Sequence, residues 1–99
     1  MPASITLQEL KQQANPNYHI IDIRPSYEYA RGHVKNAVNI PYDVLMMYPD
    51  SYLKRGEAYY LICAHGSLSQ RASIILQSHG YNVANVENGY NMDMRYCYC

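Results

Sequence analysis

Two continuous apolar runs, "YHIIDI" at Tyr18–Ile23 and "AYYLIC" at Ala58–Cys63, are each followed by a polar turn and a helical pattern. A run of this length without polar alternation is typical of a strand that is buried on both faces of a parallel sheet. Strands that alternate with helical segments predict an α/β fold in which helices cover both faces of such a sheet. These two runs therefore constrain the architecture more than any other feature of the chain.

Shorter segments fit the same alternation. Strands are predicted at residues 4–5, at "AVNIP" (37–41) and at residues 82–86. Thr6 and Glu9 form a T-x-x-E box, which predicts the start of a helix. Further helices are predicted over "PSYEYARG", over "YDVLMMYPD" with a break at Pro49, and after Cys63. Turns or helix ends are expected at "NPN" (15–17), Gly32, Gly80 and Asn88–Gly89.

Two predicted helices carry an apolar stripe at helical spacing, which indicates the side that packs on the sheet. The first stripe consists of Leu7, Leu10 and Ala14. The second consists of Leu68, Ala72, Ile75, Leu76 and His79.

The 99 residues predict a single domain over 1–99, without repeats or linkers. Its end, "YNMDMRYCYC" (90–99), is predicted to be a short helix or a loose tail, with the loose tail over 93–99. Eight basic and eight acidic residues cancel, so we expect no nucleic-acid partner. The longest apolar run is too short to span a bilayer, and the first residues lack the pattern of a secretory signal, so we expect no membrane partner and a cytoplasmic location.

The chain has three cysteines, Cys63, Cys97 and Cys99. A disulfide scaffold is not expected, because their number is odd and no secretory signal is evident. A lone C-x-C without a second pair also gives little support for a metal site. Cys97 and Cys99 are interpreted as reduced thiols of the terminus, and the alternative is that they resolve a persulfide on Cys63 or form a disulfide with it.

Ligands of open α/β sheets bind beyond the carboxyl ends of the strands, and Asp22 and Cys63 both fall at such ends. The loop "CAHGSLS" then leads into a helix, whose first N–H groups are unpaired and favour an anion. A thiolate is such an anion, and cysteines in this setting ionise closer to neutral pH. Gly66 would allow the turn, and Ser67 and Ser69 would donate hydrogen bonds. The alternative is that Cys63 is a small buried apolar residue.

The segment "DIRPSYEYARGHVKNAVNIP", Asp22 to Pro41, resembles the signature of rhodanese-like sulfurtransferase domains. The cysteine loop and "YNVANVENGY" resemble later parts of the same family, so the likeness extends over about Ile5 to Met94. The loop is similar to that of short single-domain bacterial thiosulfate sulfurtransferases. The resemblance implies a five-stranded parallel sheet with flanking helices.

The resemblance also implies that Cys63 is the catalytic residue and takes up a sulfane sulfur as a persulfide. The implied donor is a small sulfur compound such as thiosulfate, and the acceptor is cyanide or a thiol, for example thioredoxin or a sulfur-relay protein. No cofactor and no metal are required. The implied substrate-binding residues are Ala64, His65, Gly66, Ser67, Leu68 and Ser69, and the supporting residues are Asp22, Arg24 and His33.

Two departures from the family pattern matter. Many relatives carry arginines where this chain has Ala64 and Leu68, so we expect weaker attraction for thiosulfate. Asn36 stands where glycine commonly precedes the alanine, and asparagine tolerates a left-handed backbone.

Two other functions occur on folds of this kind. Phosphatases and arsenate reductases of similar fold need a Cys-x5-Arg motif, whose arginine binds the substrate anion. Ser69 occupies that arginine position here, so this alternative is disfavoured. The remaining alternative is a non-catalytic rhodanese-like module that binds a partner or senses redox state.

Overall fold

The computed structural model describes residues 4–6, 8–10, 19–87 and 89–90. Several sequence predictions lie outside these residues. They are the positions of Leu7 and Ala14, the "NPN" stop, the part of the last turn at Asn88, the tail over 93–99, and the roles of Cys97 and Cys99.

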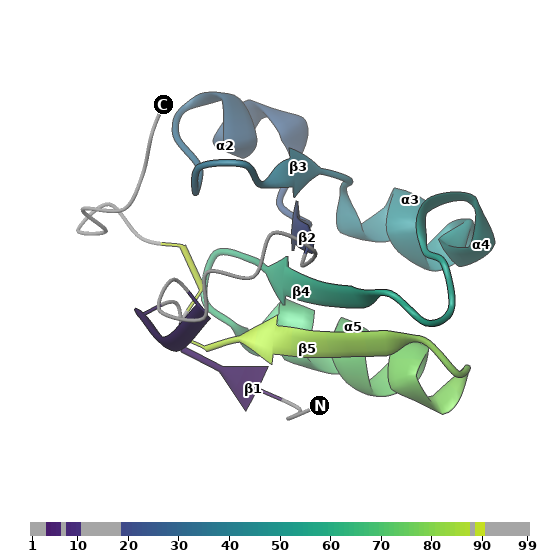
Figure 1. Ribbon diagram of the computed structural model, residues 1–99. Helices are drawn as coiled ribbons and strands as arrows, with labels where there is room; N and C mark the ends of the chain where they lie inside the picture. Colours follow the sequence, from purple (N-terminus) through teal and green to yellow (C-terminus); the bar gives the residue numbers. More distant parts are fainter. Residues whose placement is uncertain (1–3, 7, 11–18, 88, 91–99) are drawn as a thin grey trace.

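Five parallel strands form one sheet in the order β1-β5-β4-β2-β3, as Figure 1 shows. The two predicted apolar runs become its centre, since β4 pairs with both β2 and β5. The α/β fold with a five-stranded parallel sheet is thereby confirmed. The strands are β1 (Ser4–Ile5), β2 (His19–Asp22), β3 (Val38–Asn39), β4 (Ala58–Ile62) and β5 (Asn82–Val86).

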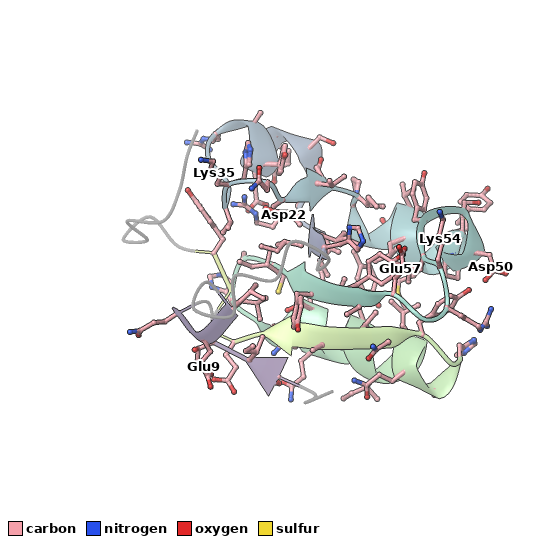
Figure 2. The ribbon with its side chains drawn as sticks, in the orientation of Figure 1. Glu9, Asp22, Lys35, Asp50, Lys54 and Glu57 are labelled. Carbon is pink, nitrogen blue, oxygen red and sulfur yellow. The ribbon has the colours of Figure 1, made fainter. Side chains whose placement is uncertain are left out.

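Alternate residues of β4 supply two separate cores, one on each face of the sheet. Tyr60 and Ile62 pack with Leu10 on one face, and Leu61 packs with Leu76 on the other. A strand that faces apolar layers on both sides needs no polar alternation, which explains the continuous run in the sequence. The charged residues labelled in Figure 2 lie around these cores and not within them, except for Asp22, which is buried.

Short helices connect most strands, and one long helix follows β4. Besides the helical residues 8–10, the helices in the described part of the chain are α2 (Ser26–Ala30), α3 (Tyr42–Met47), α4 (Pro49–Tyr52) and α5 (Ser67–Ser78). The predicted break at Pro49 is confirmed, and this proline begins α4 because a helix's first turn does not need its missing N–H. Asn36 has φ of 70°, so it adopts the left-handed conformation expected where relatives carry glycine. No helix in the described ranges is long and apolar enough to cross a membrane.

The predicted box at Thr6 and Glu9 forms in full. Thr6 N and Oγ1 donate to Glu9 Oε1 at 3.0 and 2.8 Å, and Glu9 N donates to Thr6 Oγ1 at 3.0 Å. The hydrogen bond from the Thr6 backbone, followed by that from its side chain, lowers the pKa of Glu9. Leu10, one turn later, is fully buried as its place in the first stripe predicts.

The predicted stripe on α5 is wrong in part. Ala72 and Leu76 are buried, but Leu68 and Ile75 are 36% and 38% exposed, and His79 is also exposed. The buried side is instead Ser69, Ala72, Ser73 and Leu76, which is the same spacing moved round the helix. Ser69 N donates to the Cys63 sulfur at 3.2 Å, so one of the two inward serines lies at the sulfur.

Candidate active site

The cysteine loop begins directly after β4 and ends where α5 begins. Ile62 is the last residue of the strand, and Ile23 N donates to its carbonyl at 2.9 Å, which holds the strand end against the chain that leaves β2. Gly66 has φ of 87°, a left-handed conformation that glycine adopts without steric cost, and the helix starts at Ser67. The transition from strand to helix that the sequence predicts is therefore formed by residues 62–67.

Two main-chain N–H groups, one in this loop and one in the first turn of α5, converge on the Cys63 sulfur. Gly66 N lies 3.1 Å and Ser69 N 3.2 Å from Cys63 Sγ, and Ser69 Oγ lies 3.3 Å from it. Donors placed in this way stabilise negative charge on sulfur, as the hypothesis of an anion-binding loop requires. The thiol is also only 3% exposed and packs in the apolar layer beneath α5. The site thus combines burial with directed donors.

A buried polar chain continues from Ser69 across the sheet. Ser69 Oγ donates to Asn85 Oδ1 and lies 3.2 Å from Gly66 O, and Asn85 Nδ2 lies 3.4 Å from Ser4 Oγ. Ser69 and Asn85 are both buried. Asn85 is a site residue that the sequence analysis missed. Its signal was an asparagine inside the otherwise apolar strand end "VANV".

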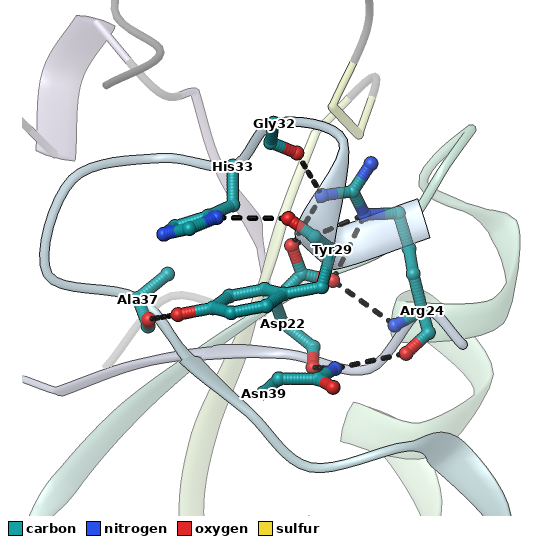
Figure 3. A network of polar contacts seen from close by, with 7 residues as sticks. All are labelled: Asp22, Arg24, Tyr29, Gly32, His33, Ala37 and Asn39. Carbon is teal, nitrogen blue, oxygen red and sulfur yellow. Dashed lines mark hydrogen bonds and ion pairs between the residues drawn. The ribbon is translucent and has the colours of Figure 1, made fainter. Parts of the chain in front are cut away.

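The carboxyl end of β2 supports the loop from the side through a buried ion pair (Figure 3). Arg24 Nη2 lies 2.7 Å from Asp22 Oδ2 and donates to Gly32 O at the same distance. Burial alone would lower the pKa of Arg24, but the hydrogen bonds and charge of Asp22 outweigh it and raise that pKa. Arg24 therefore stays a cation in the interior, with its charge neutralised by Asp22.

Tyr90 connects this ion pair to the cysteine loop. The Arg24 guanidinium lies 4.2 Å from the centre of the Tyr90 ring, and Tyr90 N donates to Cys63 O at 2.7 Å. Gly89 makes this approach possible, because an added Cβ would lie 2.3 Å from Cys63 O. Asp22 and Arg24, predicted as supporting residues, are thus brought to the site, whereas Tyr90 and Gly89 were not predicted.

His33, the third predicted supporting residue, contacts the α2 segment. Its ring stacks on Tyr29 with centroids 3.7 Å apart, and its Nδ1 lies 2.9 Å from Tyr29 O. Tyr29 in turn donates its hydroxyl to Ala37 O (Figure 3). His33 therefore orders the turn between α2 and β3.

Among the described residues, His65 lines two pockets that flank the cysteine loop. The α2 pocket, of about 490 Å³, is lined by Arg24, Glu28, Arg31, Gly32, Ala64, His65 and Tyr90. The β5 pocket, of about 320 Å³, is lined by Ser4, His65, Gly66, Ser67, Gln70, Asn85 and Glu87. The predicted substrate-binding residues Ala64 to Ser67 thus border a pocket, whereas Leu68 is part-exposed and Ser69 lies buried against the sulfur.

Across the residues with a described placement, no three His, Cys, Asp or Glu side chains lie together in a way that could hold a metal ion.

Fold and loop together define a class: α/β domains with a cysteine cradled at the carboxyl end of a parallel sheet. The family model described as Rhodanese-like domain matches residues 6–92, and the chain belongs to this family. The crystal structure of a protein from Staphylococcus saprophyticus is similar with a TM-score of 0.80 and 37% identity, covering 93% of this chain and 91% of that one.

Two curated relatives are longer proteins. Protein HIGH ARSENIC CONTENT 1, mitochondrial, of Arabidopsis thaliana is 33% identical over 86 residues, which is 75% of this chain and 51% of the relative. An adenylyltransferase and sulfurtransferase of Ogataea parapolymorpha is 30% identical over 86 residues, which is 86% of this chain and 22% of the relative. The chain thus spans about half of the first relative and about a fifth of the second.

Proposed function

We propose that this domain is a sulfurtransferase that carries a sulfane sulfur on Cys63 as a persulfide. The observation that carries the proposal is the pair of amides, Gly66 N and Ser69 N, that both lie within 3.2 Å of the Cys63 sulfur. Membership of the rhodanese-like family and the sulfur-transferring relative from Ogataea support the same class of activity.

With thiosulfate as donor, the Cys63 thiolate attacks the outer sulfur. A new S–S bond forms as the old one breaks, sulfite leaves with the bonding electron pair, and Cys63–S–S⁻ remains. Cyanide or a thiolate then removes the terminal sulfur and regenerates the Cys63 thiolate. The loop amides stabilise the anion in both states, and the two separate half-reactions predict ping-pong kinetics.

Burial of the thiol favours a second candidate, a rhodanese-like module that senses redox state or binds a partner without turnover. Cys63 is only 3% exposed, and inert structural cysteines are commonly buried in this way. The two candidates differ in whether sulfur is transferred to Cys63.

The deciding experiment incubates the reduced protein with thiosulfate and analyses the Cys63 peptide by mass spectrometry. We expect a gain of one sulfur atom on Cys63 and release of sulfite. The Cys63→Ser variant should lack thiosulfate:cyanide sulfurtransferase activity, whereas Cys97→Ser/Cys99→Ser should keep it. Equal activity of wild type and Cys63→Ser would refute the proposal, and a folded protein without the adduct would favour the sensing or binding module.

A further inference from the structure

The Cys63 sulfur has hydrogen-bonding neighbours that favour opposite charge states. Gly66 N and Ser69 N donate to it at 3.1 and 3.2 Å, and donors of this kind favour a thiolate. The sulfur itself donates to Ser69 Oγ at 3.3 Å, which only a neutral thiol can do. The balance between thiol and thiolate therefore depends on where the proton of the Ser69 hydroxyl points.

Asn85, in β5, determines that direction. Ser69 Oγ donates its one proton to Asn85 Oδ1, so its lone pairs are left to face the thiol. A second acceptor, Gly66 O, lies 3.2 Å from the same oxygen. Ser69 and Asn85 are 0% and 4% exposed, so the bond between them can be broken only at the cost of leaving a buried polar group without its partner.

The sheet holds the Asn85 side chain in this orientation. Asn85 lies in register with Ser4 of β1 on one side and with Leu61 of β4 on the other. Its Nδ2 donates to Ser4 Oγ at 3.4 Å, while its Oδ1 accepts from Ser69. Because both ends of the amide are engaged, Asn85 presents an acceptor, and not a donor, to Ser69.

Ionisation of Cys63 conflicts with this arrangement. When the thiol loses its proton to a base in solution, the sulfur loses its bond to Ser69 Oγ and faces the lone pairs of that oxygen. The hydroxyl can donate to the thiolate only if its proton turns away from Asn85 Oδ1. Each ionisation therefore costs either a repulsive contact or a buried hydrogen bond.

We propose that Asn85 is a positioning residue that acts through the Ser69 hydroxyl to oppose the ionisation of Cys63. It holds the hydroxyl proton away from the sulfur, so the two amides stabilise the thiolate without help from this group. More of Cys63 then stays in the less reactive thiol form. The inference rests on Cys63 as the reacting residue of the proposed function, and its test needs no sulfur donor.

The charged and titratable groups around the loop are the same in every protein compared below. His65 lies in the loop, Glu87 follows β5, and the pair of Asp22 and Arg24 reaches the loop through Tyr90. Since none of these groups is altered, a difference between variants reports on the hydrogen bonds of Ser69 and Asn85.

The test measures the rate of Cys63 alkylation by iodoacetamide as a function of pH. Asn85→Leu removes the acceptor and keeps a side chain of similar volume, and Asn85→Ala removes it without added bulk. Both are compared with wild type, with Ser69→Ala and with the double variant Asn85→Leu/Ser69→Ala, all carrying Cys97→Ser/Cys99→Ser. The matched control is Asn82→Leu, the same substitution at the exposed first residue of β5.

We expect both Asn85 variants to move the midpoint of the pH–rate profile to lower pH by about one pH unit, because the released hydroxyl donates to the thiolate. Below the midpoint, alkylation should be about 10-fold faster than in wild type. Asn85→Leu should add nothing to the rate of Ser69→Ala, since the hydroxyl through which it acts is absent. Asn82→Leu should leave the profile unchanged.

An unchanged midpoint in a folded Asn85 variant would overturn the inference. An equal shift with and without the Ser69 hydroxyl would also overturn it, because Asn85 would then act by another route. Urea unfolding follows the fold, and its loss in both variants would assign Asn85 to stability alone and end the case for positioning. None of these results bears on whether thiosulfate adds sulfur to Cys63, so the proposed function is judged separately.

Discussion

At the scale of the residue, the Ser69 hydroxyl has three polar neighbours but only one proton to donate. It donates to Asn85 Oδ1, lies 3.2 Å from Gly66 O, and lies 3.3 Å from the Cys63 sulfur. A thiol can donate to this oxygen, whereas a thiolate needs a donor in return. Ser69 Oγ therefore accepts a hydrogen bond from the neutral thiol of Cys63, while its own proton is donated to Asn85.

We predict that Ser69→Ala speeds the reaction of Cys63 with iodoacetamide about 5-fold at neutral pH, because the bond lost, worth about 1 kcal/mol, is one that the neutral thiol donates to Ser69 Oγ. The Ser69 N–H, which donates to the sulfur, remains in this variant. The control is Ser67→Ala, which removes an exposed hydroxyl of the same loop. Rates should be measured on the Cys97→Ser/Cys99→Ser background, and equal rates for the two alanine variants would contradict the role given to Ser69.

The sequence predicted single residues well where their requirement is local. Asn36 is an example, since its left-handed conformation depends only on its own backbone. Asn85 and Tyr90 were missed because their contacts with Ser69 and Cys63 join distant parts of the chain. Such contacts follow from strand order and register, which the sequence pattern alone does not specify.

At the scale of the element, the loop between β4 and α5 depends on the conformation of one glycine. Gly66 and Gly56 both have positive φ, 87° and 95°, so alanine is strained at each. Of these two glycines, only Gly66 has its N–H directed at the Cys63 sulfur. An added Cβ at Gly56 meets nothing within 4 Å, which makes Gly56 a matched control for backbone strain alone.

We predict that Gly66→Ala and Gly56→Ala each lower the free energy of unfolding by about 1 kcal/mol, the cost of a left-handed alanine. Urea unfolding should show this similar loss. Only Gly66→Ala should also slow persulfide formation on Cys63, because only there does the strained backbone carry a donor to sulfur. If the two variants formed persulfide at the same rate, the Gly66 amide would have no part in activating Cys63.

Helix α5 shows why element faces are harder to predict than element bounds. The sequence predicted a helix after Cys63 with Gly80 ending it, and α5 spans Ser67–Ser78. The predicted stripe followed the largest apolar residues, yet the helix buries Ser69 and Ser73 and leaves Ile75 part-exposed. Ser69 on this buried side contacts Cys63, and hydrophobic periodicity does not register such a polar contact.

At the scale of the whole molecule, the buried pair of Asp22 and Arg24 joins parts of the fold that are distant in sequence. Asp22 ends β2, which lies between β3 and β4 in the sheet. Arg24 reaches Gly32 beyond α2 and the ring of Tyr90 beside the cysteine loop. Buried ion pairs add little stability over apolar residues, but removal of one partner leaves the other charge without compensation.

We therefore predict that Asp22→Asn lowers the free energy of unfolding by about 3 kcal/mol, because Arg24 keeps its charge in the interior without a carboxylate. Asp50→Asn is the control: Asp50 is an exposed acid 3.7 Å from Arg55, and its loss should cost less than about 1 kcal/mol. The double variant Asp22→Asn/Arg24→Gln should be more stable than Asp22→Asn alone, since no unpaired charge remains buried. Urea unfolding should show lower midpoints with an unchanged slope, as expected when stability changes and the unfolded state does not. Equal losses for Asp22→Asn and Asp50→Asn would mean that the pair does not hold these parts of the fold together.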